Sequence, residues 1–354
     1  MLDYEVVVIG GGQAGLTAGY YLQKQNIRYV ILEAHYEVGE SWAGRFSGLT
    51  LFTPDNLNTL PGFKQPKGVG EYLTKDEFAH YLREYVKYHN FNIQLNSKVT
   101  SVSQSPVGFR ILLKSGQKIT ARQVILATGA FANPVKSDFS AIMPKTVKQF
   151  TPEDIKNFQC QNKKVLVVGD GASGRQLAKL FAVNNEVTLA CGRKRFLIPP
   201  KVFGFETFNL LKKSGVFSLS KQSWLGKRLK QRDPFPNTGL DFESLKRLGI
   251  SLKPKLTGFN TTAVFTDKST FAADIVIWAM GYHNQYGFVD IPGVFLNDQL
   301  VTDKGLTPVS GLYTLSTPWQ VNRASALICG VGADMKRLLP SIMDRQQALS
   351  AESL

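Results

Sequence analysis

Two glycine-rich turns, each between an apolar run and a stretch typical of a helix, have the pattern best suited to chemistry. The first places Gly10, Gly12 and Gly15 in the spacing G-x-G-x-x-G, with Gln13 and Ala14 inside it. The first glycine of this pattern permits a tight turn, the second lets the backbone approach a pyrophosphate, and the third lets the helix pack on the strand. Amide groups at the helix start then face the phosphates. The turn therefore predicts a dinucleotide site.

An acidic residue supports that prediction. Glu33 ends the apolar run that follows the first helical stretch, about 20 residues after the turn. A carboxylate at this distance accepts hydrogen bonds from the hydroxyls of a ribose. We therefore expect Glu33 to hold the ribose of the nucleotide that lies against the first turn.

The second turn, GDGASG, repeats the spacing with Gly169, Gly171 and Gly174, and it encloses Ala172 and Ser173. It follows the apolar run VLVV and leads into another helical stretch. We expect these five residues to hold the phosphates of a second dinucleotide.

The strand predicted after this second helix ends in cations rather than in an acid. Gly192 is followed by Arg193, Lys194 and Arg195. Arginine and lysine bind a 2′-phosphate, which a carboxylate would repel, so the pattern favours NADP(H) over NAD(H). The alternative is that these cations belong to a basic surface. In the first unit the strand after the helix ends in an acid, and in the second it ends in basic residues. Together the two units predict one FAD and one NADPH, with the nicotinamide brought against the isoalloxazine for hydride transfer.

The elements that position these turns follow a strand–turn–helix–strand order in residues 3–34 and again from residue 163. Runs of Val, Ile and Leu before each turn are typical of strands buried on both faces of a parallel sheet. The intervening region predicts an amphipathic helix and then three β segments, at residues 75–90, 97–105, 109–115 and 123–131.

Two similar phrases, VILATG at residues 124–129 and VIWAMG at residues 276–281, mark where the chain changes domain. Each is an apolar strand that stops at a glycine. We therefore expect an α/β fold of two Rossmann-like dinucleotide-binding domains, with the NADPH domain inserted into the FAD domain. The expected ranges are 1–155 and 281–354 for the FAD domain and 160–280 for the NADPH domain.

The charge of the chain is concentrated in one region. The net charge at pH 7 is +15, and residues 193–232 contain eleven lysines and arginines against the single acid Glu206. Aromatic and aliphatic residues lie between them. One interpretation is a solvated basic face, and another is a surface attracted to anionic lipid or to a phosphorylated ligand. No recognised nucleic-acid-binding module accompanies the charge, so a nucleic-acid partner is not expected.

Apolar stretches, targeting signals and cysteine spacing indicate where in the cell the protein is expected. No stretch approaches the roughly 18 consecutive apolar residues of a membrane span, and no basic region followed by a cleavable apolar segment begins the chain. Cys160, Cys191 and Cys329 lie far apart without a CxxC motif, so neither a disulfide framework nor a metal site is expected. We expect a cytoplasmic protein, with a peripheral membrane contact through residues 193–232 as the alternative.

In combination, these motifs resemble the flavin-containing monooxygenase superfamily, and most closely its compact bacterial members, which are labelled as potassium-transport or metal-resistance-associated flavoproteins. The resemblance runs nearly end to end. Besides the two turns and Glu33, it rests on VGESW, RFSGLTLFTPDNLNTLPG, LATGAFANP, WAMGYH and TPVSGLYTLSTPWQVNRASALICGVGAD, at residues 38–42, 45–62, 126–134, 278–283 and 307–334.

The resemblance implies roles for further residues. It places Met280 and Gly281 at a hinge beside the nucleotides, and it makes Asn56, Gln320 and Asn322 the candidates for catalysis. Beside the FAD it places Ser41, Trp42, Phe52, Val99, Ala127, Thr128 and Gly129. For Trp42, a role as a core anchor is the alternative to stacking near the flavin.

The chain departs from the superfamily at the monooxygenase fingerprint FxGxxxHxxx(Y/F/W). Counting from Phe139, Ala141 stands at the glycine position and Lys145 at the histidine position. The resemblance therefore implies FAD and NADPH binding but leaves oxygen insertion open.

The residues and the resemblance together support three hypotheses. The first is an NADPH-dependent, FAD-containing monooxygenase that forms a flavin hydroperoxide and uses O₂ to oxygenate a small sulfide, amine or ketone. The second is an NADPH-dependent flavin reductase of a disulfide, quinone or protein acceptor, without oxygen insertion. The third is a redox-sensing accessory flavoprotein of a membrane transporter. The substrate and the oligomeric state stay open, and a homodimer is one option.

Overall fold

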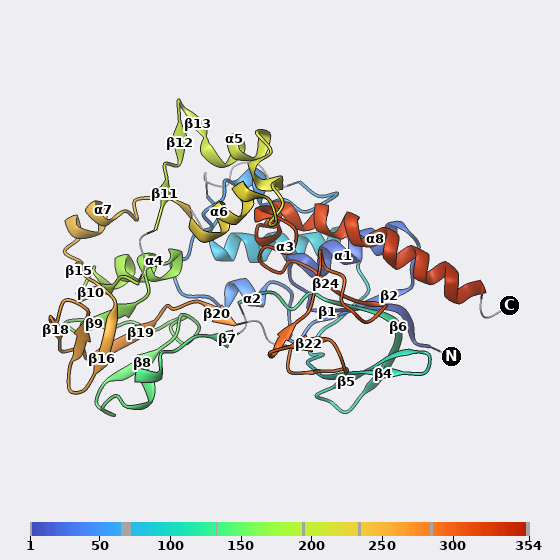
Figure 1. Cartoon of the computed structure of the whole chain (residues 1–354), viewed down its shortest axis with the longest axis horizontal. Coiled ribbons are helices and arrows are strands. Elements are labelled where there is room, and N and C mark those ends of the chain that lie inside the picture. Colours follow the sequence, from blue (N-terminus) through green and yellow to red (C-terminus); the bar gives the residue numbers. More distant parts are fainter. Residues whose placement is uncertain are drawn as a thin grey trace.

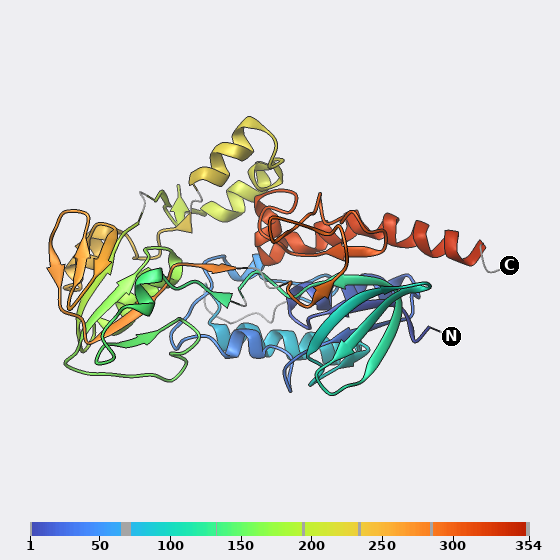
Figure 2. The same ribbon diagram turned by 60° about the horizontal axis from the view of Figure 1, so that its bottom comes forward.

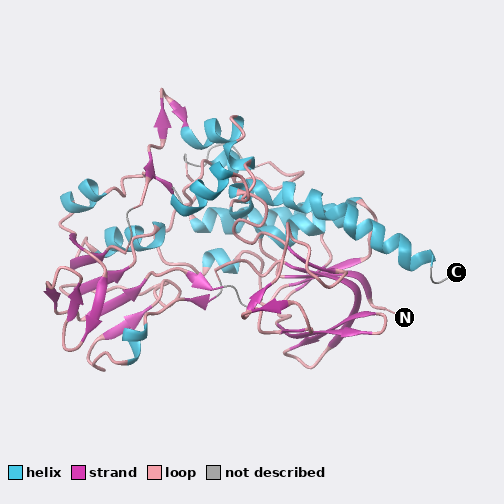
Figure 3. Ribbon diagram, in the orientation of Figure 1, coloured by secondary structure: helices cyan, strands magenta, loops and turns pink. Residues whose placement is uncertain are grey.

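The two largest β-sheets of the described chain, with eight and five strands, lie side by side, and each of them carries one glycine-rich turn (Figure 1). The computed structural model describes residues 2–64, 72–131, 133–192, 195–232, 235–283 and 286–351. Most of the longer helices lie along one side of the two sheets (Figure 3). This is the α/β architecture expected from two βαβ units, and it confirms the predicted fold class.

The first sheet holds β1 (Tyr4–Ile9), β2 (Tyr29–Leu32), β3 (Ile93–Gln94), β4 (Val99–Ser105), β5 (Gly108–Leu113), β6 (Lys118–Leu126), β21 (Val289–Asp290) and β24 (Leu312–Thr314). Its order is β21-β4-β5-β6-β1-β2-β3, and β24 also pairs with β6. The central strand β1 runs parallel to both β2 and β6. Val6, Val7 and Val8 are all fully buried, so both faces of β1 are covered, as the apolar run predicted.

Three long helices belong to this part of the chain: α1 (Gln13–Lys24), α3 (Lys75–His89) and α8 (Ile328–Ala351). The α3 helix confirms the predicted helix and begins with a capping box, in which the Thr74 side chain accepts the amide of Glu77 and the Glu77 side chain accepts the amide of Thr74. The α8 helix packs against α1. Shorter elements here are α2 (Glu40–Ala43), η1 (Asp55–Leu57), η4 (Arg323–Ala326), β22 (Phe295–Leu296) and β23 (Gln299–Leu300).

The second sheet is formed by β8 (Lys148–Phe150), β9 (Lys164–Val168), β10 (Glu186–Ala190), β15 (Ser251–Lys253) and β19 (Ile275–Trp278). All neighbours run parallel in the order β15-β10-β9-β19-β8. Around it lie α4 (Ala172–Phe181), α7 (Phe242–Arg247), η2 (Asp138–Ala141), β16 (Leu256–Phe259), β17 (Ala263–Phe265) and β18 (Thr270–Phe271). These strands come from chain that interrupts the first sheet between β6 and β21. The exact domain boundaries stay a prediction, and β8, inside the range 1–155, pairs with the second sheet.

The chain crosses between the two sheets along two paired linkers. The outgoing strand β7 (Asn133–Pro134) pairs antiparallel with the returning strand β20 (Tyr282–His283). The amide of Val135 also donates to the carbonyl of Gly281 at 2.9 Å. Both crossings follow the similar phrases that the sequence singled out, so the hinge predicted at Met280 and Gly281 lies directly before the returning strand.

A separate excursion, defined here as residues 195–232, leaves the second sheet after β10 and stands away from both sheets (Figures 1 and 2). It contains β11 (Leu197–Ile198), β12 (Lys201–Val202), β13 (Phe205–Glu206), α5 (Thr207–Lys213), η3 (Val216–Ser218) and α6 (Trp224–Arg232), and β14 (Phe235–Pro236) follows it. Within the described part of the chain, no helix is both long and apolar enough to cross a membrane.

Candidate functional site

The first cradle is the turn between β1 and α1, and steric contacts fix its glycines. Gly10 has φ +106°, and a Cβ there would lie 2.6 Å from the carbonyl oxygen of Ala127. A Cβ at Gly15 would collide with the carbonyl oxygen of Gly10. A Cβ at Gly12 would meet no atom within 4 Å. The turn is thus closed by the end of β6 at Gly10 and by its own backbone at Gly15, and it is open at Gly12, which is the side on which a ligand can approach.

Glu33 lies beside this cradle at the end of β2 and is largely buried. Its Oε2 accepts the amide of Gly11 at 2.6 Å, and its Oε1 accepts the amide of His35 at 2.9 Å. The same Oε1 lies 2.6 Å from Nδ1 of His35. Burial alone would raise the pKa of Glu33, but the hydrogen bonds from His35 and Gly11 outweigh it and hold that pKa below its ordinary value. The carboxylate is therefore charged and fixed in place.

The residues after β6 face the same turn. Ala127 supplies the carbonyl that meets Gly10, and the Cα of Thr128 would lie 3.3 Å from a Cβ at Gly10. The hydroxyl of Thr128 is buried and has no hydrogen-bond partner within the described residues. Gly129 follows with φ +75°. An orphaned buried hydroxyl beside an open glycine is a polar atom that a bound nucleotide can satisfy.

Other residues expected at the first cradle take different positions. The indole Nε1 of Trp42 donates to Oε1 of Gln13 at 3.1 Å, which joins α2 to the start of α1. Ser41, one residue earlier, is exposed. Val99 begins β4, and the segment just before it runs beside Glu33, whose carbonyl accepts the amide of Ser97 at 2.7 Å.

The second cradle, between β9 and α4, repeats this backbone. Gly169 has φ +105°, and a Cβ there would collide with the carbonyl oxygen of Ala279. A Cβ at Gly174 would collide with the carbonyl oxygen of Gly169. A Cβ at Gly171 would meet only the guanidinium of Arg195, whose nearest nitrogen is 3.7 Å away. Ala172 and Ser173 begin α4, so the same open helix start faces the second cradle.

The two cradles differ in their carboxylates. Ile9 pairs with Leu32 in the first sheet, and Val168 pairs with Ala190 in the second. In this register Cys191 takes the place of the strand-end acid. Burial raises the pKa of Cys191 to about 11, so the thiol stays neutral.

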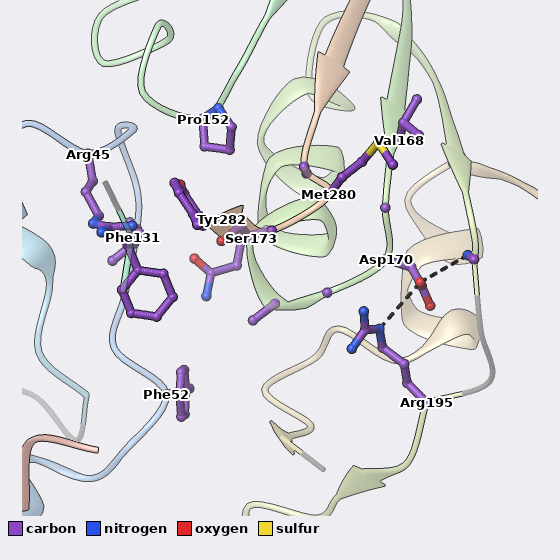
Figure 4. A pocket seen from close by; sticks show the side chains of 18 of the residues that line it. Arg45, Phe52, Phe131, Pro152, Val168, Asp170, Ser173, Arg195, Met280 and Tyr282 are labelled. Atoms are coloured by element: carbon purple, nitrogen blue, oxygen red, sulfur yellow. Dashed lines mark hydrogen bonds and ion pairs between the residues drawn. The ribbon is translucent and has the colours of Figure 1, made fainter. Parts of the chain in front are cut away.

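An aspartate inside the second turn supplies the carboxylate that the strand end lacks. Asp170 is 1% exposed and stands where the first turn has Gly11. Its Oδ1 accepts the amide of Gly192 at 3.3 Å and lies 3.5 Å from Nε of Arg195, as Figure 4 shows. Its Oδ2 lies 3.3 Å from Nη2 of the buried Arg175. One carboxylate is therefore shared by two arginines, and it holds Arg195 at the mouth of the cradle.

No role was predicted for Asp170 or Arg175, although both belong to the phrase GDGASGR. Their signal was an acid between the first two glycines and an arginine directly after the third. The expected cations Arg193 and Lys194 lie outside the described residues.

A cavity of about 1100 Å³ connects the two halves of the molecule (Figure 4). Its wall includes Gln13 and Trp42 from the first half and the turn at 169–173 from the second. Of the residues predicted at the cofactor sites, those that line it are Gln13, Trp42, Phe52, Gly169, Gly171, Ala172, Ser173, Arg195, Met280 and Gly281. The cavity thus runs from the second cradle to the start of α1 in the first.

Arg45, which the sequence did not single out, lies in the wall of this cavity among three aromatic rings. Its guanidinium carbon is 5.7 Å from the ring centre of Trp42, 5.2 Å from that of Phe131 and 5.7 Å from that of Tyr282. Phe131 and Tyr282 belong to the two linkers and pack edge to face. Burial raises the pKa of Tyr282, so its phenol is neutral. Arg45 therefore joins α2 to both linkers (Figure 4).

The three candidates for catalysis make internal contacts and are not among the residues that line this cavity. The amide of the Asn56 side chain donates to Oδ1 of Asn209 in the excursion at 3.0 Å. The buried Gln320 accepts the Thr317 hydroxyl at 3.1 Å, and the backbone amide of Asn322 donates to Ser325. Their catalytic role stays a prediction.

The segment that replaces the fingerprint begins in the cavity wall and then leaves it. Ser137, Asp138 and Phe139 line the cavity, whereas Ala141 and Lys145, at the glycine and histidine positions, are exposed. This segment therefore presents no histidine to the cavity.

Comparison with known proteins agrees with this architecture. A family profile described as pyridine nucleotide-disulphide oxidoreductase matches residues 7–197. A curated relative, the uncharacterized oxidoreductase CzcO-like of Geobacillus kaustophilus, is 35% identical over 96% of this chain and 98% of its own. The structure of a flavin-containing monooxygenase from Stenotrophomonas maltophilia covers 97% of this chain and 99% of its own, with a TM-score of 0.80 and 24% identity. The structure of OTEMO in complex with FAD and NADP covers 98% of this chain and 86% of its own, with a TM-score of 0.69 and 15% identity.

Proposed function

Because the chain belongs to the pyridine nucleotide-disulphide oxidoreductase family, we propose that it is an NADPH-dependent, FAD-containing monooxygenase of small molecules. The observation that carries the proposal is the duplicated glycine cradle, with a strand-end carboxylate at the first copy and a held arginine at the second. The similarly folded OTEMO binds both FAD and NADP.

The first cradle fits FAD. The open side of Gly12 and the orphaned hydroxyl of Thr128 face the same turn, and Glu33 stands ready to accept ribose hydroxyls. We assign to FAD the residues Gly10, Gly12, Gln13, Ala14, Gly15, Glu33, Ser41, Trp42, Phe52, Val99, Ala127, Thr128 and Gly129. The corresponding domain is residues 1–155 and 281–354, with β8 transferred to the second domain because it pairs with β19.

The second cradle fits NADPH better than NADH. The neutral thiol of Cys191 replaces the acid that would repel a 2′-phosphate, and Asp170 directs Arg195 to the mouth of the cradle. The charge of Asp170 is balanced by two arginines, so the cluster keeps a net positive charge. We assign to NADPH, within residues 160–280, Gly169, Gly171, Ala172, Ser173, Gly174, Arg193, Lys194 and Arg195, with Met280 and Gly281 at the hinge.

When bound, FAD supplies the redox chemistry: it accepts a hydride from NADPH and activates O₂ for transfer to a sulfide, amine or ketone. The residues of this chain bind the two cofactors, orient them toward each other and shield the reacting atoms from water. The cavity joins the second cradle to Gln13 and Trp42, and along it a bound nicotinamide would reach the flavin. Apolar side chains such as Leu49, Leu51 and Phe52 line it and keep water from the reacting atoms.

A second candidate is an NADPH-dependent flavin reductase of a disulfide, quinone or protein acceptor that inserts no oxygen. The exposed Ala141 and Lys145 at the fingerprint positions favour it, because the histidine of the fingerprint is missing.

Oxygen incorporation distinguishes the two candidates. Purified protein with bound FAD is supplied with NADPH, ¹⁸O₂ and either an aryl methyl sulfide or a cyclic ketone. A monooxygenase yields the sulfoxide or the ester carrying one ¹⁸O atom, with one NADPH consumed for each product. If NADPH is consumed and hydrogen peroxide is the sole product with every substrate, the monooxygenase proposal fails and the reductase is retained.

A further inference from the structure

The excursion has an unusual balance of charge and apolar surface. Residues 195–232 contain nine lysines and arginines and one acid, Glu206. The acid lies 3.5 Å from Lys201 across the β12–β13 hairpin and accepts the hydroxyl of Tyr72 at 3.2 Å. Apart from Arg195, which pairs with Asp170, five of the other cations, Lys212, Lys213, Lys227, Arg228 and Lys230, are exposed, and the segment holds no second acid.

The base of the excursion is fixed to the first half of the molecule. Phe208 of α5 and Phe217 of η3 are buried in one cluster with Leu57 and Leu327. The amide of Lys221 donates to the carbonyl of Val321 at 3.1 Å. These contacts hold the excursion in one orientation, so the residues at its tip are presented at a defined place.

The tip is an aromatic hairpin turn. Val202 pairs with Phe205, which leaves Phe203 and Gly204 as the two-residue loop. Both loop residues have positive φ, 49° and 79°, a conformation that favours Asn, Asp or Gly and is strained for a bulky residue. The Phe203 ring is 95% exposed, and the Phe205 ring is 66% exposed. Among the residues that the structure describes, no packing accounts for a Phe203 ring held at a strained position in water.

The excursion carries further exposed apolar and basic side chains. Trp224 at the start of α6 is 70% exposed and Leu225 is 50% exposed. The guanidinium of Arg228 lies 5.4 Å from the Trp224 ring centre. Exposed cations on the two helices are Lys212, Lys213, Lys227, Arg228 and Lys230. Aromatic rings next to lysines and arginines are the composition of segments that lie in the interface of an anionic membrane.

We propose that the excursion docks the protein on an anionic phospholipid bilayer, with the Phe203 tip in the headgroup–acyl boundary and the cations of α5 and α6 against the lipid phosphates. The charge of the excursion is complementary to such a surface. A single projecting ring also fits a soft layer, which closes around it, whereas a rigid protein would need a matching pocket for it. The contact is peripheral, and it extends the proposed function without depending on it.

Vesicle flotation of the full-length holoprotein tests the proposal. The vesicles are either phosphatidylcholine alone or equal parts phosphatidylcholine and phosphatidylglycerol. We expect flotation with the anionic vesicles, little with the neutral ones, and release when ionic strength rises from about 0.05 M to about 0.5 M. F203D lowers the partition coefficient at least about tenfold, because the ring no longer leaves water. K212Q combined with K213Q weakens binding and reduces its salt dependence.

A matched control tests whether the loss of vesicle binding is specific to the hairpin tip or common to any exposed apolar residue. Val183 is 77% exposed and lies before β10, at the end of that strand opposite to the excursion. V183D keeps wild-type flotation, and both variants keep the flavin spectrum and the unfolding temperature of the wild type. Failure of the wild type to float, equal flotation with neutral vesicles, or unchanged flotation of F203D overturns the proposal. Self-association without lipid that F203D abolishes assigns the tip to a second copy and also overturns it.

Discussion

In the first cradle the carboxylate of Glu33 lies at the end of β2, whereas in the second the carboxylate of Asp170 lies in the turn itself. The two backbones are otherwise nearly the same, with φ +106° at Gly10 and +105° at Gly169. The glycine pattern therefore builds a phosphate cradle, and the position of the carboxylate decides what surrounds the ribose. At the second cradle Cys191 takes the strand-end position, and Asp170 in the turn holds Arg195 at the mouth of the cradle.

The largest effect is expected where the start of each helix packs against the first glycine of its own turn. In G15A the new Cβ collides with the Gly10 carbonyl, and in G174A it collides with the Gly169 carbonyl. We expect G15A to be purified with less than about a tenth of the wild-type flavin. G174A keeps its flavin, but NADPH reduces that flavin at least about a hundredfold more slowly. Absorbance spectra and anaerobic rapid mixing measure both.

Two milder variants guard against simple misfolding. G12A and G171A place a Cβ in open space or near Arg195 only, so the free protein folds as the wild type does. Each is expected to weaken its own cofactor, FAD for G12A and NADPH for G171A. Loss of flavin in G171A with full retention in G12A would reverse the assignment of the two cradles.

The next largest difference in cofactor affinity is expected from the two residues at the matching strand ends, Glu33 and Cys191. E33A removes the acceptor for the ribose and leaves the amide of Gly11 without its 2.6 Å partner. We expect FAD affinity, measured by fluorescence titration of the apoprotein, to fall about a hundredfold, since hydrogen bonds to charged groups contribute about 1.5–3 kcal/mol each. C191A, at the matching place of the second cradle, changes neither FAD nor NADPH affinity by more than about twofold. Equal losses of cofactor affinity in E33A and C191A would show that the two cradles do not differ at the strand end.

Arg195 and Asp170 are expected to affect one nucleotide selectively. R195A is expected to raise KM for NADPH about thirtyfold and to leave KM for NADH unchanged, because the role proposed for the arginine is to bind the 2′-phosphate, which NADH lacks. D170N keeps the side-chain shape but weakens the hold on Arg195, so the preference for NADPH falls about fivefold while kcat stays near that of the wild type. A D170N variant with equal losses for NADPH and NADH would show that Asp170 supports the fold and does not position Arg195.

The smallest effect concerns pH and arises from Glu33 and His35 at the first cradle. The hydrogen bond to Glu33 raises the pKa of His35 above its ordinary 6.5, so the stabilisation is full below pH 6.5 and is lost as pH rises through the raised pKa. The pKa of Glu33 is held below 4.5, so its contribution is full above pH 4.5 and is lost only in stronger acid. Because His35 is half-exposed, we expect about 1 kcal/mol or less.

Thermal unfolding of the wild type and H35Q between about pH 5 and about pH 9 measures this effect. The wild type is the more stable below pH 6.5, and the difference narrows as pH rises. A constant difference across this range would contradict the pairing of His35 with Glu33.

Local patterns were enough to predict the elements and the glycine turns. The helix at 75–90, the strands before each turn and the acid at Glu33 all follow from spacing and apolar runs. Asp170 was not predicted because its role depends on the register that places Cys191 opposite, and on the burial of Arg175. Sequence pattern treats such an arginine as a surface charge.

The excursion shows a second limit of sequence patterns. Phe203 and Phe208 are the same residue type five positions apart, yet one is 95% exposed and the other is 4% exposed. Only the packing of α5 against Leu57 and Leu327 distinguishes them. Likewise, Asn56 fits a flavin-side position by sequence, but its side chain binds Asn209 of the excursion.

The assignment of the two cradles is tested most directly by anaerobic rapid mixing of the purified wild-type flavoprotein with NADPH and, separately, with NADH. The second cradle with its held Arg195 predicts that bleaching of the flavin absorbance, expressed as reduction rate over Kd, is at least about tenfold more efficient with NADPH, or about 1.4 kcal/mol. Equal efficiency, a preference for NADH, or a purified protein that binds no flavin would contradict it.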